Sequence, residues 1–167
     1  MSDDWLADDD KTRFYTLREL DNLRDEGLTR GKLIDFHSRY KLLLLAHSQP
    51  DYRQLGPFVA AIAQWPSPET FFTAYRERIV SLLAHPATRR NHTNVLMHVQ
   101  GYFRPHLNAS QKQELTSLID EYRQGRQPLL APVTLLKHYM AEFPDAYLAG
   151  QRYFSLWPDV MSERDEH

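Results

Sequence analysis

The sequence predicts an all-α fold, a single globular helical domain of about seven or eight helices. Apolar residues recur at steps of three and four over most of the chain. Helix start and stop signals, such as a capping Ser or Asp, a first-turn proline or a terminal glycine, separate these segments. No alternating apolar and polar run longer than a few residues predicts a strand, and no internal repeat is present.

Four helices are expected in the first half of the chain. The fourth has the strongest start signal, because a cap, a proline and an acid follow one another. In the second, apolar residues and two histidines fall on one face at steps of three and four. The expected limits are Thr12 to Gly27, Thr29 to about residue 49, Gly56–Pro57 to Pro66, and Ser67–Pro68–Glu69 to Pro86.

Four further helices are expected in the second half. A capping box and a terminal glycine delimit the second of them, and prolines delimit the third. Their expected signals are an Asn91 cap for the helix to about His106, Ser110 with Gln113 up to Gly125, Pro132 to Pro144, and an Asp145 cap for a helix ending before Pro158.

The composition is that of one soluble domain of 167 residues, with 42% hydrophobic and 25% charged residues. The longest apolar run, residues 42–46, is far short of a membrane span, and the acidic N-terminus does not resemble a secretory signal, so a cytoplasmic location is expected. Without cysteine, the chain cannot form disulfides or hold an iron–sulfur cluster by thiolates. The expected organisation is a disordered acidic segment over residues 1–11, the helical domain over 12–158, and an acidic tail over 159–167.

The small net charge of −2 conceals an uneven distribution. Residues 1–26 hold nine acids against four bases, and residues 159–167 hold four acids against one base. Residues 27–158 hold fifteen Lys or Arg against nine Asp or Glu, a net charge of +6. A basic body between acidic ends suits a protein that meets an anionic partner, although ordinary surface scatter could give the same balance.

The most unusual of the expected helices covers residues 92–106, HTNVLMHVQGYFRPH. Its apolar residues predict a segment that faces the interior, yet Asn94, His98 and Gln100 lie among them. A buried amide or imidazole without a partner costs about 1–3 kcal/mol. At helical spacing Asn94, His98 and Tyr102 form one stripe. Two interpretations stay open: a core helix whose polar groups are satisfied by neighbouring carbonyls, and a stripe that binds a ligand.

Cations recur beside aromatic residues in the segments HSRYK, KHY and GQRYF. Arg89 and Arg90 precede a helix N-terminus, where backbone N–H groups already favour a phosphate. Arginines that hold phosphates and rings that stack on bases are typical of proteins that bind single-stranded RNA. The structural alternative is that the tyrosines are core residues: Tyr40, Tyr102, Tyr139 and Tyr153.

Other chemistry has little support in the sequence. No two histidines have the four-residue spacing of a helical metal site, and no nucleophile elbow or glycine-rich phosphate loop is present. We therefore expect no metal and no other cofactor.

Three segments of the chain resemble the YbgA family, a small bacterial family of unknown function. They are GLTRGKLIDFHSRYKLLLLAHSQPDYRQLG, HTNVLMHVQGYFRPHLN and QPLLAPVTLLKHYMAEFPDAYLAGQRYFSLWP, and with the spacing between them the resemblance covers about residues 14–158. Domains of this family also occur fused to thiouracil-desulfidase-like domains, where they are thought to help bind tRNA. The desulfidase half is absent here.

The resemblance implies a non-catalytic RNA-binding module, with tRNA as its partner, that assists a separate thiouridine desulfidase. One alternative is a small enzyme with a pocket around Asn94, His98 and Tyr102, in which His98 is the general acid or base. Another is a protein–protein adaptor linked to DNA repair, which meets its partner through the acidic N-terminal segment or residues 42–45. The residues expected to reach a phosphate or base are Arg30, His37, Arg39, Lys41, Arg89, Asn94, His98, Arg104, Lys137, His138, Arg152 and Tyr153.

Overall fold

The computed structural model describes residues 8–155, and this part of the chain is helical and without strands. The all-α prediction is confirmed, with eight helices of seven residues or more and two of a single turn within the described range. The α-helices are α1 (Asp9–Glu26), α2 (Arg30–Arg39), α3 (Lys41–His47), α4 (Gln49–Ala60), α5 (Pro68–Leu83), α6 (Arg89–Phe103), α7 (Ala109–Arg123), α8 (Leu130–Glu142), α9 (Ala146–Ala149) and α10 (Arg152–Ser155). Two short 3₁₀ segments, η1 (Ile62–Gln64) and η2 (Arg104–His106), follow α4 and α6.

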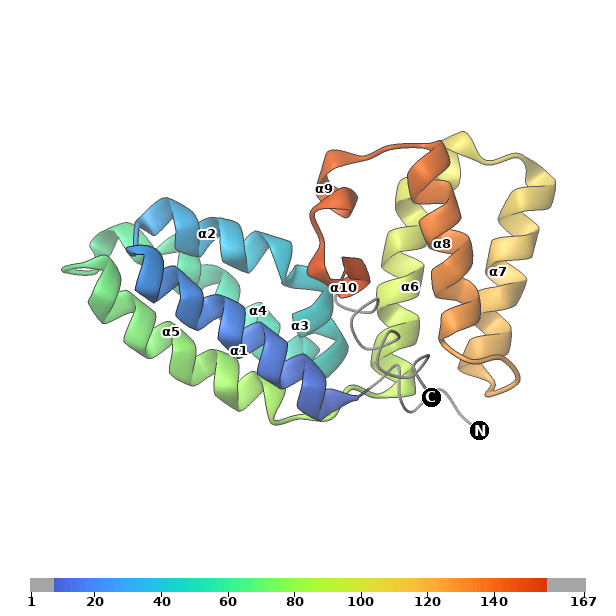
Figure 1. Cartoon of the computed structure of the whole chain (residues 1–167). Coiled ribbons are helices and arrows are strands. Elements are labelled where there is room, and N and C mark those ends of the chain that lie inside the picture. The colour runs from blue at the N-terminus through green and yellow to red at the C-terminus, as the bar shows by residue number, and fades with distance from the viewer. Residues whose placement is uncertain (1–7, 156–167) are drawn as a thin grey trace.

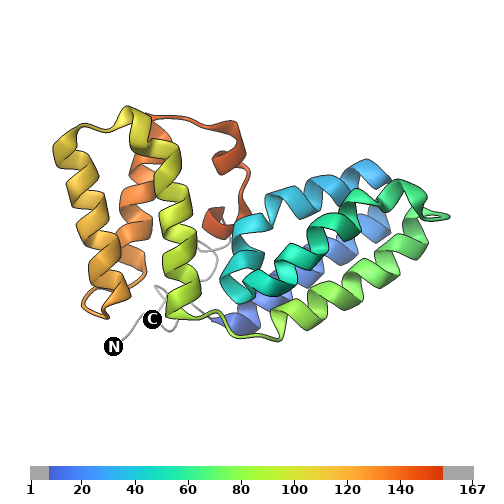
Figure 2. The same cartoon turned by 180° about the vertical axis from the view of Figure 1, so that it is seen from behind.

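The helices form two groups (Figures 1 and 2). The N-terminal group contains α1, α2, α4 and α5, and the C-terminal group contains α6, α7 and α8, which pack pairwise on one another. Helices α3 and α10 lie between the two groups, and α9 lies close to them at the end of the chain. Residues 84–88, after α5, lead from the first group into α6.

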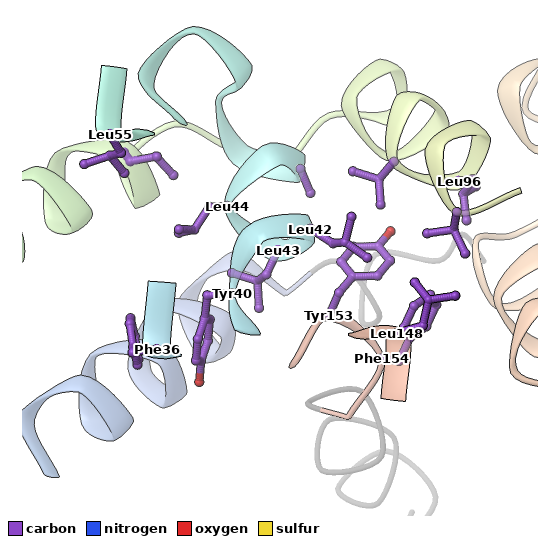
Figure 3. Close-up of a cluster of buried hydrophobic side chains, with 14 of the residues drawn as sticks. Phe36, Tyr40, Leu42, Leu43, Leu44, Leu55, Leu96, Leu148, Tyr153 and Phe154 are labelled. Carbon is purple, nitrogen blue, oxygen red and sulfur yellow. The ribbon is translucent and has the colours of Figure 1, made fainter. Parts of the chain in front are cut away.

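Helix α3 supplies core residues to both groups. Leu42 and Leu44 have no exposed surface, and Leu43 is 3% exposed. In Figure 3, Leu42 points toward Tyr153 of α10, whereas Leu44 points toward the side where Leu55 of α4 lies. The leucine run is therefore in the core, which removes Leu42, Leu43 and Leu44 as the partner surface of an adaptor.

The expected long helix from Thr29 is interrupted at Tyr40, where α2 ends and α3 begins. The side chain of Gln151, 1% exposed, spans this interruption. Its Nε2 donates to the Ser38 carbonyl oxygen (2.8 Å), and its Oε1 accepts from the Leu42 N–H (3.2 Å). The amide thus satisfies backbone groups on both sides of the break. The last expected helix is divided in two, because Gln151 lies outside both α9 and α10.

Several helix starts differ from those expected because a nearby residue caps instead. Helix α1 begins at Asp9, capped by Asp8, so residues 9–11 belong to the helix rather than to a disordered segment; residues 1–7 and 159–167 lie outside the described range. Helix α4 begins at Gln49, capped by Ser48, and contains Pro57. Thr88 and Asn108 cap α6 and α7, two or three residues before Asn91 and Ser110. The expected caps Thr29, Ser67 and Asp145 are confirmed.

Helix α1 neutralises part of the basic body. Glu19 pairs with Arg39 (2.8 Å) and with Arg152 (3.0 Å), and Asp21 pairs with Arg76 (2.8 Å). The hydrogen bond from the Arg76 guanidinium holds the pKa of the Asp21 carboxyl below its usual value. The acidic N-terminal region and the basic body are therefore partly one network, and fewer cations remain free than the charge count suggests.

Candidate nucleic-acid interface

The first half of α6 presents both cations and polar groups at the surface. Thr88 caps the helix by accepting from the Asn91 N–H, and the first backbone N–H groups have no carbonyl partner within the helix. Arg89, Arg90 and Asn94 are exposed, while His92 and the apolar residues on the opposite side are buried. The interior placement expected for Asn94 and His98 is wrong, since both are exposed; the stripe turns outward along one edge of the helix.

Three arginines surround a hollow of about 520 Å³ between α6 and α7, here called the arginine hollow. Arg89 donates from Nη1 to the Tyr122 carbonyl oxygen (2.5 Å), and its guanidinium lies 4.6 Å from the centre of the Tyr122 ring. Arg123 donates to Asp120 from Nε and Nη2 (2.9 and 2.6 Å). Arg90 makes no hydrogen bond or ion pair with another residue of the described range. The other lining residues are Thr93, Asn94 and Met97.

Within residues 8–155, the arginine hollow combines three cations with the carboxylate of Asp120, which pairs with Arg123. The tyrosine and aspartate contacts hold the guanidiniums of Arg89 and Arg123 in place, and among the described residues no carboxylate pairs with Arg90. Guanidinium groups bind phosphate with a pair of parallel hydrogen bonds. The arrangement can therefore bind a phosphate at the N-terminus of α6, where the helix dipole favours an anion.

A second, smaller hollow of about 100 Å³ lies on the other side of Asn94, between α6 and helices α3 and α4. His98 lines it together with amides and apolar groups: Leu45, Gln49, Asn91, Asn94 and Val95. Partial burial, and then the positive charge of Lys41, lower the pKa of His98. Lys41 and His98 therefore lie on the flank of the arginine hollow, with Asn94 between the two. Among the residues that the structure describes, no carboxylate lines this hollow to orient His98 as a catalytic base.

A third hollow, of about 250 Å³, continues from the arginine hollow along the groove between α6 and α7 and is here called the methionine hollow. Thr93, Met97 and Arg123 line both hollows. Met97 is 52% exposed, contrary to its expected interior position. Gln100, by contrast, is 7% exposed and donates from Nε2 to the Thr116 hydroxyl (2.8 Å).

Two of the expected binding cations are engaged in the junction between the helix groups. Arg39 pairs with Asp35 and Glu19, both at 2.8 Å, and Arg152 pairs with Glu19 at 3.0 Å. The Tyr40 hydroxyl also donates to Glu19 (2.8 Å). A carboxylate shared by two guanidiniums and a phenol holds α1, α2 and α10 together, so Arg39 and Arg152 are less available to a phosphate than the sequence suggests.

Arg30 and His37 make contacts within the N-terminal helix group. Arg30 donates to the carbonyl oxygen of Ile62, the first residue of η1 (3.4 Å), and to that of Trp65, directly after η1 (2.7 Å). His37 is 8% exposed, contacts the Tyr75 hydroxyl at 2.9 Å through Nδ1, and stacks on Tyr52. Burial lowers the pKa of His37 to about 4, so this imidazole is neutral near pH 7.

Tyr153 is a core residue in this structure, 1% exposed, with its hydroxyl 2.7 Å from Nδ1 of His92. Burial, followed by His47 and Arg89, lowers the pKa of His92 to about 3. The ring of Tyr153 has no face open to a base. Of the four tyrosines with a structural alternative, Tyr40, Tyr139 and Tyr153 are buried, and Tyr102 is half-buried.

The remaining expected residues lie away from the arginine hollow. Arg104 is exposed in η2, at the opposite end of α6. Lys137 and His138 are exposed on α8, and His138 lies 3.9 Å from Glu142. The structure thus brings together Arg89, Asn94, His98 and Lys41, and it places the other expected cations elsewhere.

Sequence reasoning missed Arg123 as a site residue. At the last turn of α7 it has the pattern of an ordinary C-terminal cation, and only the packing of α7 against α6 places it opposite Arg90. Met97, which was expected in the interior, and Thr116 were also not predicted as site residues. Arg89 and Arg90 were expected just ahead of the helix and instead form its first turn, because Thr88 is the cap; their closeness to the helix N-terminus was a usable signal.

Other kinds of site are not found over residues 8–155. No group of three His, Asp or Glu side chains is placed to hold a metal ion there. In the same range no helix combines the length and apolar character needed to cross a membrane. A further hollow of about 340 Å³ between α4 and α5 is lined by Asp51, Glu77 and Arg78, a mixture that is less suited to a phosphate.

Comparison with known proteins places the chain beside uncharacterised relatives. Residues 41–158 match a family model described as "Protein of unknown function (DUF1722)". The chain is 61% identical over 158 residues to the "Uncharacterized protein YbgA" of Escherichia coli (strain K12), covering 93% of this chain and 94% of the relative. No solved structure matches the chain.

Proposed function

We propose that this protein, which belongs to the YbgA (DUF1722) family, binds RNA, and tRNA in particular, through the arginine hollow. The observation that supports the proposal is the convergence of Arg89, Arg90 and Arg123 on one hollow at the N-terminus of α6. Lys41 extends this positive surface past Asn94 to the junction with α3. A binding surface of this kind acts on the phosphate backbone and gives affinity that falls steeply with salt.

The cysteine-free composition supports a binding role rather than sulfur chemistry in this chain. A thiolate-held iron–sulfur cluster needs cysteines, and this chain has none to offer. In the proposal, the protein holds tRNA for a separate thiouridine desulfidase, in line with the fused proteins that its family resemblance suggests. Its own contribution is to position the nucleic acid.

The test is the binding of bulk tRNA and of a duplex DNA control at two salt concentrations, by wild type and two variants. Arg90→Ala removes the cation whose charge is not matched within the described residues. Arg18→Ala removes an exposed cation on α1 and serves as the matched control. We expect salt-sensitive binding that prefers tRNA, weakened roughly fivefold by Arg90→Ala and unchanged by Arg18→Ala, since one phosphate contact is worth about 1 kcal/mol.

The salt dependence gives a second, independent measure. Loss of one phosphate contact should lower the slope of log affinity against log salt by about 0.7–0.9. Equal slopes for wild type and Arg90→Ala would place the phosphate contacts outside the arginine hollow. Absence of tRNA binding at low salt would refute the proposed function itself.

A further inference from the structure

The arginine and methionine hollows form one continuous groove with two different chemical characters. They share Thr93, Met97 and Arg123, so a ligand can occupy both at once. One end is cationic, through Arg89 and Arg90. The other end has Met97 on α6 and Ile119 on α7 as its apolar lining. The Asp120 carboxylate also lines this end, and it is paired with Arg123.

The apolar end of this groove is suited to a flat ring. Met97 is 52% exposed although it is unbranched and apolar, and a thioether contacts aromatic rings favourably. Ile119 is 4% exposed and supplies a hydrocarbon floor, and Thr93 and Thr116 add methyl groups. An exposed methionine beside such a floor leaves apolar surface that a ring can cover.

The same end also offers a polar group for recognition. Gln100 is 7% exposed, and its amide is fixed at one end by the hydrogen bond from Nε2 to the Thr116 hydroxyl. Its amide oxygen receives no hydrogen bond from the described residues, and the side chain lines the methionine hollow. This oxygen is open to the hollow rather than sealed in the core, so it can accept a hydrogen bond from a donor group at the edge of a ligand.

We infer that the methionine hollow takes the base of an unstacked RNA nucleotide whose phosphate lies in the arginine hollow. This inference rests on the proposed function and adds to it the form of the RNA that is recognised. A base can contact Met97 by its face and Gln100 by its edge only when it has left the helical stack, as in a loop or a single-stranded end. Duplex segments would then bind through phosphates alone.

The test compares two single-stranded ligands of equal charge, a twelve-residue RNA of mixed sequence and a ribose-phosphate dodecamer that lacks every base. Wild type should bind the intact RNA roughly tenfold more tightly, as expected for one or more bases that contact apolar side chains. Met97→Ala and Gln100→Met should reduce this preference several-fold and leave binding of the abasic strand unchanged. Arg90→Ala should weaken binding of both strands alike.

Ile34→Ala is the matched control, because Ile34 is an exposed apolar residue (47%) on α2, away from the groove. Met97 is largely exposed, so its truncation tests the base site without disturbing the core, whereas Gln100→Met is checked by its melting temperature. Equal binding of the intact and abasic strands would overturn the base site while leaving the phosphate site in place. Binding of tRNA without binding of the dodecamer would also overturn it, and loss of all RNA binding would instead refute the proposed function.

Discussion

Lowering the pH from 7 to 5 should destabilise this protein through its buried histidines. Burial lowers the pKa of His37 to about 4, and burial, followed by the neighbouring His47 and Arg89, lowers that of His92 to about 3. Burial also lowers the pKa of His47, whose Nδ1 donates to the His85 carbonyl oxygen. In the unfolded chain each of these imidazoles takes up a proton near pH 6.5.

The sign follows from proton uptake. Between about pH 6.5 and the folded-state pKa, the unfolded state binds more protons than the folded state, so the free energy of unfolding falls as the pH falls. From pH 7 to pH 5, a histidine with a folded pKa of 4 or below loses about 2 kcal/mol of stability. His37 and His92 together therefore account for a loss of about 4 kcal/mol, a large part of the stability of an ordinary domain.

The measurement is urea unfolding at pH 7 and at pH 5, for wild type and for His92→Gln. The variant loses the contact with Tyr153 and is less stable at both pH values, but its loss between the two should be about 2 kcal/mol smaller than that of wild type. His37→Gln provides the same comparison if the first variant is too unstable. His138→Gln, at an exposed position on α8, is the control that should follow wild type. A loss of the same size in wild type and in both core variants would refute the description of these histidines as buried and neutral.

Three further outcomes follow from other contacts. Gln151→Leu should lower the free energy of unfolding by about 1–3 kcal/mol in urea titrations, because the buried Leu42 N–H loses its acceptor at the break between α2 and α3, whereas the Ser38 carbonyl belongs to an exposed residue; an effect below about 1 kcal/mol would show that the break does not need the amide. Glu19→Gln should cost about 1–3 kcal/mol in the same assay by removing the carboxylate shared by two arginines, whereas Glu142→Gln should cost little. Deletion of residues 2–7 removes two acids that precede α1 in the sequence, and Asp9 of α1 accepts from the N–H of Ala87, close to the start of α6. If these acids compete with RNA for the arginine hollow, tRNA binding should tighten on deletion, and unchanged affinity would exclude that competition.

The parts of the fold that the sequence predicted correctly depend on local signals, above all helix caps. Thr29, Ser67 and Asp145 each cap the helix that their sequence context indicated, because capping depends on residues within one turn. Where two cap-forming residues stand close together, as Thr88 and Asn91 do, the sequence alone did not identify which one caps, and the earlier one does. The ends of elements were therefore less predictable than their existence.

Long-range contacts explain what could not be predicted. The backbone groups at the interruption at Tyr40 are bonded by Gln151, which is more than a hundred residues away in the sequence. In the sequence Arg39 has the pattern of a surface cation, but in the structure it pairs with Glu19 of α1. Only the packing of α7 on α6 brings Arg123 into the candidate site, so the site was predicted in part, through Arg89 and the polar edge of α6.

The position of α3 between the two helix groups determines how the protein comes apart. A short helix whose leucines complete the interior of both groups cannot leave one of them without uncovering the other. Unfolding should thus be a single cooperative event, with similar hydrogen-exchange protection for amides in the centres of α5 and α6. A fragment that begins at α3 would expose leucine surface normally covered by the preceding helices, and it would aggregate rather than behave as an autonomous half.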